Sequence, residues 1–473
     1  MNKNFLKGSL RILLIYIIIA FAFKWIAGGS IAYQTQINRQ VDLTTTIGPV
    51  TENTSIKQEF MVNTDTLTSV SLCFGTFGSD AQATMGIQLT NITDDITYPE
   101  YQFDTPVMSE GMWYDVMLPE EIQDARNKKF LLTINCYAVG NSALALYYNN
   151  LPEISNIDLY INQEHLKGEL AMGTEGKLYY SYYEYYWYFA AIAGGLILLY
   201  LLYTEYCIRH KKKNAYITLS NIAVRYKFLI KQLVGRDFKN KYKRSILGYL
   251  WSFLNPVLTM AIQYVVFSTI FRSDIKNFPV YLLSGVVFFN FFTESVGQGL
   301  MAIVGNASLI TKVYVPKYIY PITKVWSSSI NLIISLVPLL LLALITGAPV
   351  NKTVVLLILP IAAILTFCMG MSLLLSTAMV FFRDTQYLWG IVSLAWMYAT
   401  PLFYPESILP ESARFILKIN PLYPIIKFVR TVLINGVSPE PMQYVYCIAG
   451  PLIVLAIGAF AFKKNQNKFV LYI

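Results

Sequence analysis

The sequence contains only two histidines, His165 and His210, among its 473 residues. The first lies in a polar segment with many strand-like runs, and the second lies in the basic run 209–213 beside an apolar segment. Zinc sites and histidine-based catalytic triads need imidazoles close to other ligands or to a nucleophile. We therefore predict no metal site and no catalytic residues in this chain.

A phosphate-binding loop of the form GxxxxGK[ST] is also missing. The nearest stretch, GTEGK at 173–177, is too short to form one. Such a loop holds the phosphates of ATP in many ATPases. The chain is therefore not expected to hydrolyse ATP alone, and we predict that it binds no cofactor.

The five cysteines form no CxxC pair and no spacing typical of metal ligands. Two of them, Cys73 and Cys136, lie in the apolar, strand-like runs SVSLCFGTF and LLTINCYAV. Buried thiols are the preferred interpretation for these two residues, and a disulfide between them is the alternative.

Charged residues make up only 14% of the chain, whereas apolar residues make up 55% and the mean hydropathy is +0.46. A soluble globular chain rarely has this balance. The apolar residues form runs long enough to cross a bilayer, which takes about 20 residues as helix. We predict eight membrane-spanning helices, at about 10–28, 187–203, 251–271, 279–303, 325–347, 353–379, 386–404 and 444–462. An even number of spans places both termini in the cytoplasm.

The net charge of +9 is unevenly distributed along the chain. Residues 30–185 contain 7 Lys/Arg and 20 Asp/Glu, a net charge of −13, so the remainder carries +22. The basic residues flank the apolar runs, and basic loops mark the cytoplasmic side of a membrane protein. This pattern predicts a multi-pass protein of the cytoplasmic membrane with residues 30–185 extracellular, and it requires no nucleic-acid partner.

Residues 30–185 contain short alternating runs, such as IKQEFMV and KKFLLTINCYAV, separated by turn residues. This pattern predicts an antiparallel β-sandwich resembling a jelly roll. The predicted fold class is therefore a polytopic α-helical membrane protein with an inserted extracellular β-sandwich. The predicted boundaries are 1–29 for the first span, 30–185 for the sandwich, 186–203 for the second span, 204–249 for a basic linker and helix, and 250–473 for a six-helix core.

Residues 204–249 contain twelve Lys/Arg and two acidic residues. Their apolar residues follow helical spacing, at Ile222, Tyr226, Leu229, Ile230 and Leu233. A basic helix with one apolar stripe is typical of the membrane interface. Farther along the chain, apolar stretches in 405–440 are interrupted by Pro and Asn and are each too short to span. We expect re-entrant or interfacial helices there.

Ionisable residues inside the predicted spans are few. Lys24 is expected to extend its ammonium group to the outer interface. For Glu294, two interpretations remain open: a site on a transport path, or a structural acid hydrogen-bonded to a neighbouring helix. So few carboxylates do not make the proton relay of a proton-driven carrier.

Three stretches of residues 225–473 resemble the permease subunits of ABC type-2 exporters, in the branch that exports polysaccharides, O-antigens and teichoic acids. They are LVGRDFKNKYKRSILGYLWSFLNPVL (233–258), NASLITKVYVPKYIYPI (306–322) and PLFYPESILPESARFILKINPLYPIIKFVRTVL (401–433). They resemble, in order, the opening motif of the core, the coupling helix and the outer re-entrant segment. The first two spans and the sandwich are additions that this family does not require.

The resemblance implies that the core pairs with a second copy of itself and with two copies of a separate ABC ATPase subunit, which binds ATP and Mg. It also implies that a lipid-linked glycan crosses the membrane. The residues implied to couple ATP hydrolysis to export are Lys312, Val313, Tyr314, Val315, Pro316, Lys317, Arg383 and Asp384. The anionic head group of the lipid carrier is expected to be attracted by residues of the basic helix and its Leu-Gly turn, which are Arg236, Lys239, Lys241, Lys243, Arg244, Leu247 and Gly248. The alternative is that these cations only fix the topology.

Sugars present C–H faces that stack on aromatic rings, so large aromatic residues of the core are channel candidates. Together with the acid of the fourth span, they are Trp251, Phe288, Phe289, Phe291, Phe292, Glu294, Trp326 and Trp396. Segments of 30–185 resemble carbohydrate-binding jelly rolls, and the glycan candidates there are Tyr98, Tyr101, Phe103, Trp113 and Tyr114. For both sets the alternative is a packing role.

Three other functions remain as alternatives: export of a drug or small lipid, a ligand-sensing membrane receptor, and a membrane glycosyl- or acyltransferase. The opening motif around Leu247 and Gly248 favours a glycan cargo. The absence of a recognisable cytoplasmic signalling domain disfavours the receptor, and the lack of clustered acids and histidines disfavours the transferase.

Overall fold

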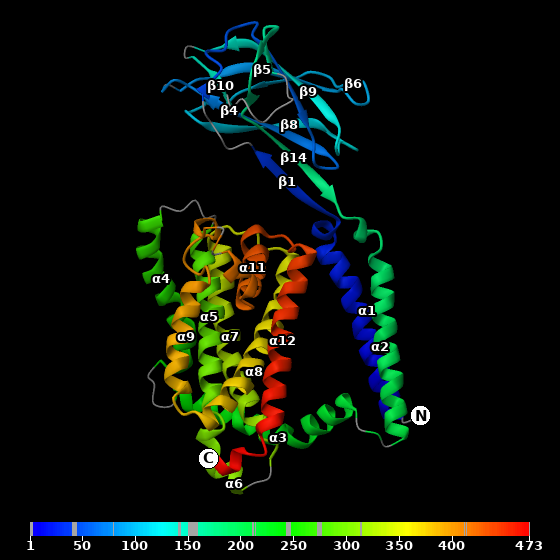
Figure 1. Ribbon diagram of the computed structural model, residues 1–473, viewed down its shortest axis with the longest axis vertical. Coiled ribbons are helices and arrows are strands. Elements are labelled where there is room, and N and C mark those ends of the chain that lie inside the picture. The colour runs from blue at the N-terminus through cyan, green and yellow to red at the C-terminus, as the bar shows by residue number, and fades with distance from the viewer. Residues whose placement is uncertain are drawn as a thin grey trace. The chain divides into compact units, whose positions relative to one another are not determined.

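The computed structural model describes residues 3–39, 45–78, 80–140, 143–149, 159–210, 212, 214–242, 247–271, 277–312, 315–410, 412 and 414–472. The chain divides into two compact units (Figure 1). Residues Ala32–Glu184 form the β domain, and residues Met1–Ile31 with Tyr185–Ile473 form the membrane unit. The boundaries agree closely with the sandwich predicted at 30–185.

The β domain consists of two antiparallel seven-stranded sheets, as the alternating runs predict. The first sheet contains β1 (Tyr33–Arg39), β14 (Met172–Tyr179), β4 (Leu67–Gly75), β10 (Ala145–Asn149), β13 (Glu169–Leu170), β2 (Thr45–Thr46) and β8 (Met112–Ile122). The second sheet contains β12 (Glu164–Leu166), β11 (Leu159–Ile161), β3 (Ser55–Met61), β9 (Lys129–Val139), β5 (Ala83–Asn91), β6 (Ile96–Thr97) and β7 (Tyr101–Asp104). A jelly-roll-like sandwich is thus inserted in the helical chain.

Several strands of the β domain bury every second residue in its core, whereas β4 is buried at almost every position. In β9 the side chains of Phe130, Leu132, Ile134 and Cys136 are buried, while the residues between them face away from the core. This is the period-2 pattern of a strand with one face on the core. Cys73 and Cys136 are both free, buried thiols, so the disulfide alternative is excluded. Burial raises the pKa of Cys73 to about 11.

Seven helices of the described residues are long and apolar enough to cross a membrane. They include α1 (Lys3–Ala32), α2 (Tyr186–Arg209), α4 (Trp251–Phe271), α5 (Phe278–Leu300), α7 (Ile319–Ile345), α8 (Ile358–Phe381) and α12 (Pro441–Asn465). Helix α5 is the most interior of the seven, because 72% of its most apolar window is buried. The amino-terminal end of α1 and the carboxyl-terminal end of the chain lie on the same side of the membrane unit (Figure 1).

The eighth predicted span, at 386–404, differs from the expectation. It corresponds to α9 (Thr385–Ala399), a helix of 15 residues. At about 1.5 Å per residue this helix is roughly 22 Å long, shorter than a hydrocarbon core of about 30 Å. The helix ends where Pro401 disfavours a helical conformation at the preceding Thr400, whose backbone is extended.

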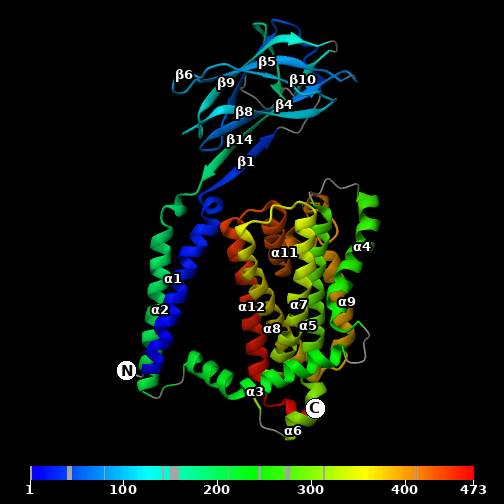
Figure 2. The same ribbon diagram turned by 180° about the vertical axis from the view of Figure 1, so that it is seen from behind.

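Helix α3 (Ala215–Tyr242) forms within 204–249, where a basic helix is predicted, and it crosses one end of the helical core (Figure 2). Tyr226, Leu229, Ile230 and Leu233 of its predicted stripe pack into a hydrophobic cluster. The side chain of Ile222 lies outside the described residues. This helix-end cluster joins α3 to α6 (Ala307–Lys312), α7, α8, α12 and α13 (Phe469–Tyr472) through Ile303, Ile310, Ile319, Tyr320, Leu373, Val380, Phe462 and Phe469.

Two short helices, α10 (Phe415–Ile419) and α11 (Leu422–Arg430), form where non-spanning helices are expected. Arg430 is buried at the end of α11. Its guanidinium donates to the backbone oxygens of Pro401 (2.7 Å), Leu402 (3.1 Å) and Tyr281 (3.2 Å), and lies 3.4 Å from the centre of the Tyr281 ring. One buried cation therefore ties α11 to α5 and to the chain after α9. A π-helical turn, Thr431–Asn435, follows α11.

The other helical segments with described bounds are short 3-10 helices, most of them next to a longer helix. They are η1 (Ser181–Tyr183), η2 (Gly248–Leu250), η3 (Val304–Asn306), η4 (Lys352–Leu357) and η5 (Glu406–Ile408). Helices α1 and α2 pair through the hydroxyl of Tyr186, which donates to the Ala20 oxygen at 2.7 Å. The Lys24 ammonium lies over the rings of Tyr186 and Trp187, so aromatic faces surround this charge in the first span.

Candidate functional site

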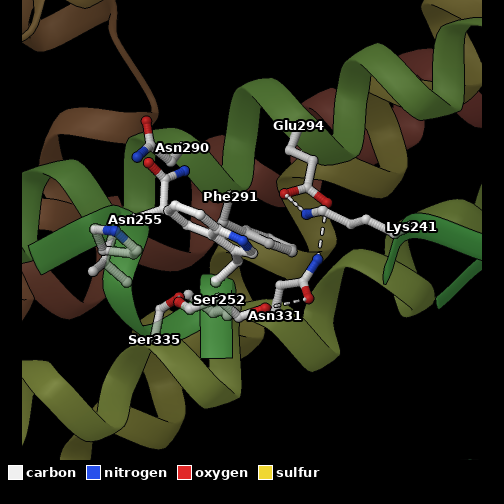
Figure 3. Close-up of a pocket in the computed structure, with 12 residues that line it drawn as sticks. Lys241, Ser252, Asn255, Asn290, Phe291, Glu294, Asn331 and Ser335 are labelled. Carbon is white, nitrogen blue, oxygen red and sulfur yellow. Dashed lines mark hydrogen bonds and ion pairs between the residues drawn. The ribbon is translucent and has the colours of Figure 1, made fainter. Parts of the chain in front are cut away.

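A polar cavity of about 240 Å³ lies among α3, α4, α5 and α7 of the membrane unit (Figure 3). Its lining combines a carboxylate, an ammonium, three amides, two hydroxyls and two large aromatic rings. The lining residues are Lys241, Trp251, Ser252, Asn255, Pro256, Val287, Asn290, Phe291, Glu294, Asn331, Leu332 and Ser335. Polar groups at this density are costly among apolar helices, so the cavity is the candidate functional site.

Glu294 is the centre of the hydrogen-bond network in this cavity. Its Oε2 atom pairs with the Lys241 Nζ atom of α3 at 2.7 Å. Its Oε1 atom accepts from Asn331 Nδ2 (3.0 Å) and Ser328 Oγ (3.4 Å) of α7, and from Gln298 Nε2 (3.0 Å) one turn along α5. The carboxylate thus connects three helices and also faces the cavity, as Figure 3 shows. The two interpretations of Glu294 from the sequence are both compatible with this position.

Pro256 extends the same network to α4. A proline inside a helix has no N–H to donate to the carbonyl oxygen four residues earlier, which here belongs to Ser252. The hydroxyl of Ser335 on α7 donates to this oxygen instead, at 2.9 Å. The Ser252 hydroxyl in turn lies 3.1 Å from Asn331 Oδ1. The Asn-Pro pair of the opening motif therefore creates a polar link between α4 and α7 at the cavity wall.

The cavity presents groups that recognise hydroxyls and phosphates. Amides and hydroxyls both donate and accept hydrogen bonds, so they suit the hydroxyls of a sugar. An ammonium suits a phosphate oxygen. Trp251, which is 44% exposed, provides an aromatic face at the edge of the cavity. This arrangement can bind and orient a polar substrate. Among the described residues, no group of His, Cys, Asp and Glu could hold a metal ion.

The basic residues predicted to attract a head group have different surroundings. Lys241 lines the cavity, whereas Arg236 donates to Asn306 Oδ1 at 3.3 Å and pairs with Asp237. Asp237 also pairs with Lys324 of α7, at 2.8 Å. Lys239 is exposed, and Lys243 and Arg244 lie outside the described residues. Leu247 is exposed and Gly248 has φ +51°, the left-handed conformation of a turn.

The residues implied to couple to an ATPase lie at the end of the unit that contains the helix-end cluster. Lys312 and Asp384 are exposed, and Val315 packs against the cluster. Lys317 donates to the Gln466 oxygen at 2.7 Å, and burial lowers the pKa of its ammonium. Arg383 donates to the Tyr472 oxygen at 3.4 Å. Pro316 is half-buried, and Val313 and Tyr314 lie outside the described residues.

The channel candidates separate into two groups. Trp251, Phe291 and Glu294 line the cavity, and Trp326 is 46% exposed on α7. The other rings, Phe288, Phe289, Phe292 and Trp396, take part in packing within the chain. Phe288 and Phe292 are fully buried, and Phe289 is 5% exposed.

Phe292 and Trp396 belong to one aromatic cluster. The Phe292 ring lies 5.2 Å from the rings of Phe367 and Trp396 and 5.6 Å from that of Trp389. Trp396 Nε1 donates to Asn420 Oδ1 at 2.8 Å. This bond fixes the indole to the segment between α10 and α11.

Most of the glycan candidates of the β domain face its interior. Tyr98 and Tyr114 pack against the core, and Phe103 is buried with its ring 5.7 Å from that of Tyr114. The Tyr101 ring lies 6.3 Å from that of Phe103. Trp113 lies on the first sheet under the guanidinium of Arg39, at 5.4 Å.

Sequence reasoning missed the amides and hydroxyls of the cavity, although a signal for them exists. Asn290, Glu294 and Gln298 recur at intervals of four, which places them on one face of α5. Asn331 and Ser335 have the same spacing on α7. A search for polar residues at helical spacing inside apolar spans would have found both faces. It would not have paired them with Lys241, which lies 53 residues before Glu294.

The fold and cavity define a multi-pass membrane protein with a polar site among its helices. Residues 229–434, which contain all the cavity residues, match the family described as ABC-2 type transporter. The chain is 31% identical over 246 residues to the O-antigen export system permease protein RfbA of Myxococcus xanthus, a match that covers 52% of this chain and 95% of that protein. It therefore belongs to the ABC-2 type transporter family.

Two other similar proteins match the same share of the chain. An O-antigen export system permease protein RfbA of Klebsiella pneumoniae is 28% identical over 243 residues, covering 51% of this chain and 93% of that protein. The polysialic acid transport protein KpsM of Escherichia coli is 22% identical over 244 residues, covering 51% of this chain and 95% of that protein. Roughly half of the chain thus corresponds to nearly a whole relative.

Proposed function

We propose that this chain is the permease subunit of an ABC transporter that exports a lipid-linked polysaccharide, such as an O-antigen or a teichoic-acid-like polymer, across the cytoplasmic membrane. One observation carries the proposal. The chain is similar, over nearly their full length, to proteins named for O-antigen export or for polysialic acid transport. The cavity around Glu294 supports it, because sugars and phosphates are the ligands that its groups suit.

In this proposal the energy comes from a separate ATPase subunit, present in two copies that bind ATP and Mg. The sequence supports this division, because it contains no phosphate-binding loop. The ATPase docks at the end where α6 and the chain around Asp384 are exposed, with Lys312 as a contact. Movement of α6 is passed to α3, α7 and α8 through the helix-end cluster.

A second copy of the chain completes the translocation path. Both termini face the cytoplasm, and the β domain lies outside the cell, as the basic residues flanking the spans indicate. This topology needs an even number of crossings, so α9 and the extended residues after it make the eighth. The head group of the lipid carrier is drawn by the cations of α3, with Lys241 nearest to the cavity.

The test of this function is deletion of the gene, followed by complementation with the wild-type chain. The amounts of polysaccharide at the cell surface and inside the cell are measured separately. Deletion is expected to deplete the surface polymer and to leave lipid-linked polymer inside, and complementation is expected to reverse both. Unchanged surface polysaccharide after deletion would contradict the proposal, as would hydrolysis of ATP by the purified chain alone.

A further inference from the structure

The second sheet of the β domain contains an irregularity beside an outward-facing tyrosine. Strand β9 pairs with β5 through Ala138 with Thr84 and through Cys136 with Met85, so Tyr137 between them has no residue opposite. Tyr137 lies on the same outward face as Thr133 and Asn135, by the alternation of β9. A β-bulge thus lies beside it, and bulges are common beside active sites. The Tyr137 ring is 43% exposed on the face of the sheet that points away from the core.

The Tyr137 ring rests on a glycine of the neighbouring strand. A Cβ atom added to Gly86 of β5 would lie 2.9 Å from Tyr137 Cε2 and 2.5 Å from Glu100 Oε1. Only a residue without a side chain leaves room for both groups above the strand. The Tyr137 hydroxyl donates to Glu100 Oε2 at 2.6 Å, and this bond raises the pKa of Tyr137. The ring is therefore held beside Gly86 and next to a carboxylate.

A row of polar groups continues from Glu100 across the sheet. Asn135 Nδ2 donates to Glu100 Oε1 at 2.8 Å, and the Ser55 hydroxyl of β3 donates to Asn135 Oδ1 at 2.9 Å. Every donor in this row points towards the carboxylate. Its oxygens have further lone pairs, which are available to a hydroxyl of a ligand.

The row leads to a surface cavity of about 630 Å³ at β3 and β11. The described residues that line it are all polar or aromatic, and they are Asn53, Ser55, Lys57, Tyr160, Asn162 and Gln163. Ser55 belongs both to the row and to the cavity. From β7 to β11 the face crosses four interstrand spacings, roughly 19 Å at about 4.8 Å each.

One wall of this cavity is a tight turn fixed to β3. Asn162 and Gln163 form the two-residue hairpin turn between Ile161 and Glu164, and both have positive φ values, +49° and +74°. Asn162 and Ser55 exchange two hydrogen bonds of 2.8 Å, from the Asn162 N–H to the Ser55 oxygen and from the Ser55 N–H to Asn162 Oδ1. The amide side chains of the turn are thus presented at a fixed position beside the cavity.

From this geometry we infer that the outward face of the second sheet binds a segment of polysaccharide. The Tyr137 ring stacks on the C–H face of one sugar, Glu100 accepts from its hydroxyls, and the cavity around Tyr160 and Lys57 holds a neighbouring sugar. The face is long enough for several sugar units in a row. This inference rests on the proposed function, since the ligand is the polymer that the membrane unit exports.

Other ligand classes fit this face less well. The net charge of −13 on residues 30–185 repels nucleic acids. Among the described residues that line the cavity, none is an aliphatic residue that would hold the side chains of a peptide. An aromatic ring with a carboxylate and several amides suits a ligand that is rich in hydroxyls. The site differs from the residues that the sequence suggested, because Tyr98, Phe103 and Tyr114 face the core.

The test measures binding of polysaccharide by the full-length chain in lipid nanodiscs, without ATP. The probe is the surface polysaccharide of cells that make this protein, freed from lipid by mild acid and labelled with a fluorophore at its reducing end. Tyr137→Ala and Glu100→Gln are each expected to weaken binding about tenfold or more, since each removes a stacking surface or a charged acceptor. Gly86→Ala is expected to weaken it similarly, because the new Cβ displaces both groups.

Matched controls lie on the same domain. Tyr179 is 45% exposed but lies on the first sheet, and Glu120 is exposed at the end of β8. Tyr179→Ala and Glu120→Gln are expected to leave the affinity within about twofold. Tyr137→Phe keeps the ring and is expected to retain most of the binding. Thermal melting of each variant identifies any loss of binding caused by unfolding.

Absence of binding by the wild-type chain, or equal binding by the wild type and folded Tyr137→Ala and Glu100→Gln variants, would overturn this inference. The same variants are expressed in cells that lack the gene, and their surface polysaccharide is measured. Restoration of surface polymer by a wild-type chain that binds no probe would reject the binding site alone. Failure of the wild-type chain to restore the polymer would instead reject the proposed function.

Discussion

The two units of this molecule place their polar residues in opposite ways. In the β domain the core is apolar, around residues such as Phe130 and Leu132, and the polar groups lie on the outward faces of the sheets. In the membrane unit large apolar residues such as Ile262 and Ile391 are 68% exposed, while Glu294 and Asn331 face an internal cavity. The polar surface of the β domain suits water, and the apolar surface of the membrane unit suits lipid. Function should therefore lie inside the membrane unit but outside the core of the β domain.

The largest effect expected from this comparison concerns the buried cation of the membrane unit. Arg430→Met removes the donors of three backbone oxygens and the contact with the Tyr281 ring. Hydrogen bonds from a charged group contribute about 1.5–3 kcal/mol each, so a loss of about 3–5 kcal/mol in unfolding free energy is expected. The measurement is thermal unfolding of the purified chain.

Lys427→Met is the matched control on the same helix. Lys427 is 46% exposed and pairs with the equally exposed Glu406 at 3.3 Å. Exposed pairs contribute at most about 1 kcal/mol, so this variant should melt close to the wild type. Equal melting of the Arg430 and Lys427 variants would show that the membrane unit does not depend on the buried cation.

The second effect separates structure from transport at the cavity. Glu294→Leu leaves Lys241 without its acid and breaks the bonds from α7, so a loss of about 1–3 kcal/mol in stability is expected. Surface polysaccharide should fall below about a tenth of the wild-type amount. The readouts are thermal melting and quantification of the surface polymer.

The double variant Lys241→Met with Glu294→Leu removes both charges of this partly exposed pair, so neither charge is left without its partner. We expect it to regain stability but not export, because the two charged groups of the cavity are lost. Normal export by this double variant would assign Glu294 a purely structural role.

A smaller effect is expected at the exposed end of α6. Lys312→Glu reverses a charge on the surface proposed for the ATPase, while the helix-end cluster beneath it stays intact. Export is expected to fall severalfold at unchanged protein level, with ATP turnover of the complex uncoupled from export. Lys352→Glu, near the other end of the membrane unit, is the charge-matched control, and equal defects in both variants would argue against α6 as the transmitting element.

The smallest effect concerns the surface of the β domain and its pH dependence. Hydrogen bonds from the Tyr147 hydroxyl and the Thr76 N–H hold the pKa of Glu110 below its usual value of about 4.3. The stabilisation from this depressed pKa is fully present above about pH 4.3 and is lost as the pH falls through the lower value in the folded state. The hydrogen bond between Tyr147 and Glu110 also raises the pKa of Tyr147, to about 12. The stabilisation from this raised pKa is lost as the pH rises from about 10 towards 12.

Tyr147→Phe removes the hydrogen bond to Glu110. It should therefore make the stability of the β domain depend less on pH, at both the acidic and the alkaline end. The measurement is hydrogen exchange of the β4 and β10 amides in the full chain between pH 3 and 7, supplemented by unfolding at alkaline pH. An identical pH profile for the variant and the wild type would contradict the role of this pair.

The sequence predicted the elements of the fold well, for physical reasons. Spans were recognisable because lipid exposure demands long apolar runs, and the stripe of α3 was recognisable because Tyr226, Leu229 and Leu233 follow helical spacing. The exception is α9, where residues 400–404 continue an apolar run although Pro401 ends the helix. Composition alone does not distinguish a long apolar helix from a shorter one with an extended tail.

The sites were predicted less well, because they depend on residues far apart in the sequence. Glu294 was recognised as an unusual acid, but its partners Lys241 and Asn331 come from other helices. In the β domain large aromatic residues were expected to bind glycan, yet Phe103 and Tyr114 pack inside it. The alternation of β9 places Tyr137 outward, but its neighbours Gly86 and Glu100 come from other segments, and the pattern of one strand does not show them.

The most direct measurement of the central claim uses inverted membrane vesicles that contain this chain and its ATPase subunit. Lipid-linked polysaccharide labelled in its sugar chain is supplied on the outer face of the vesicles, and the label protected from a glycan-degrading enzyme is followed over time. We predict ATP-dependent protection with the wild-type chain and little or none with the Lys241→Met, Glu294→Leu double variant. Protection that does not depend on ATP, or that is equal with both chains, would contradict the account.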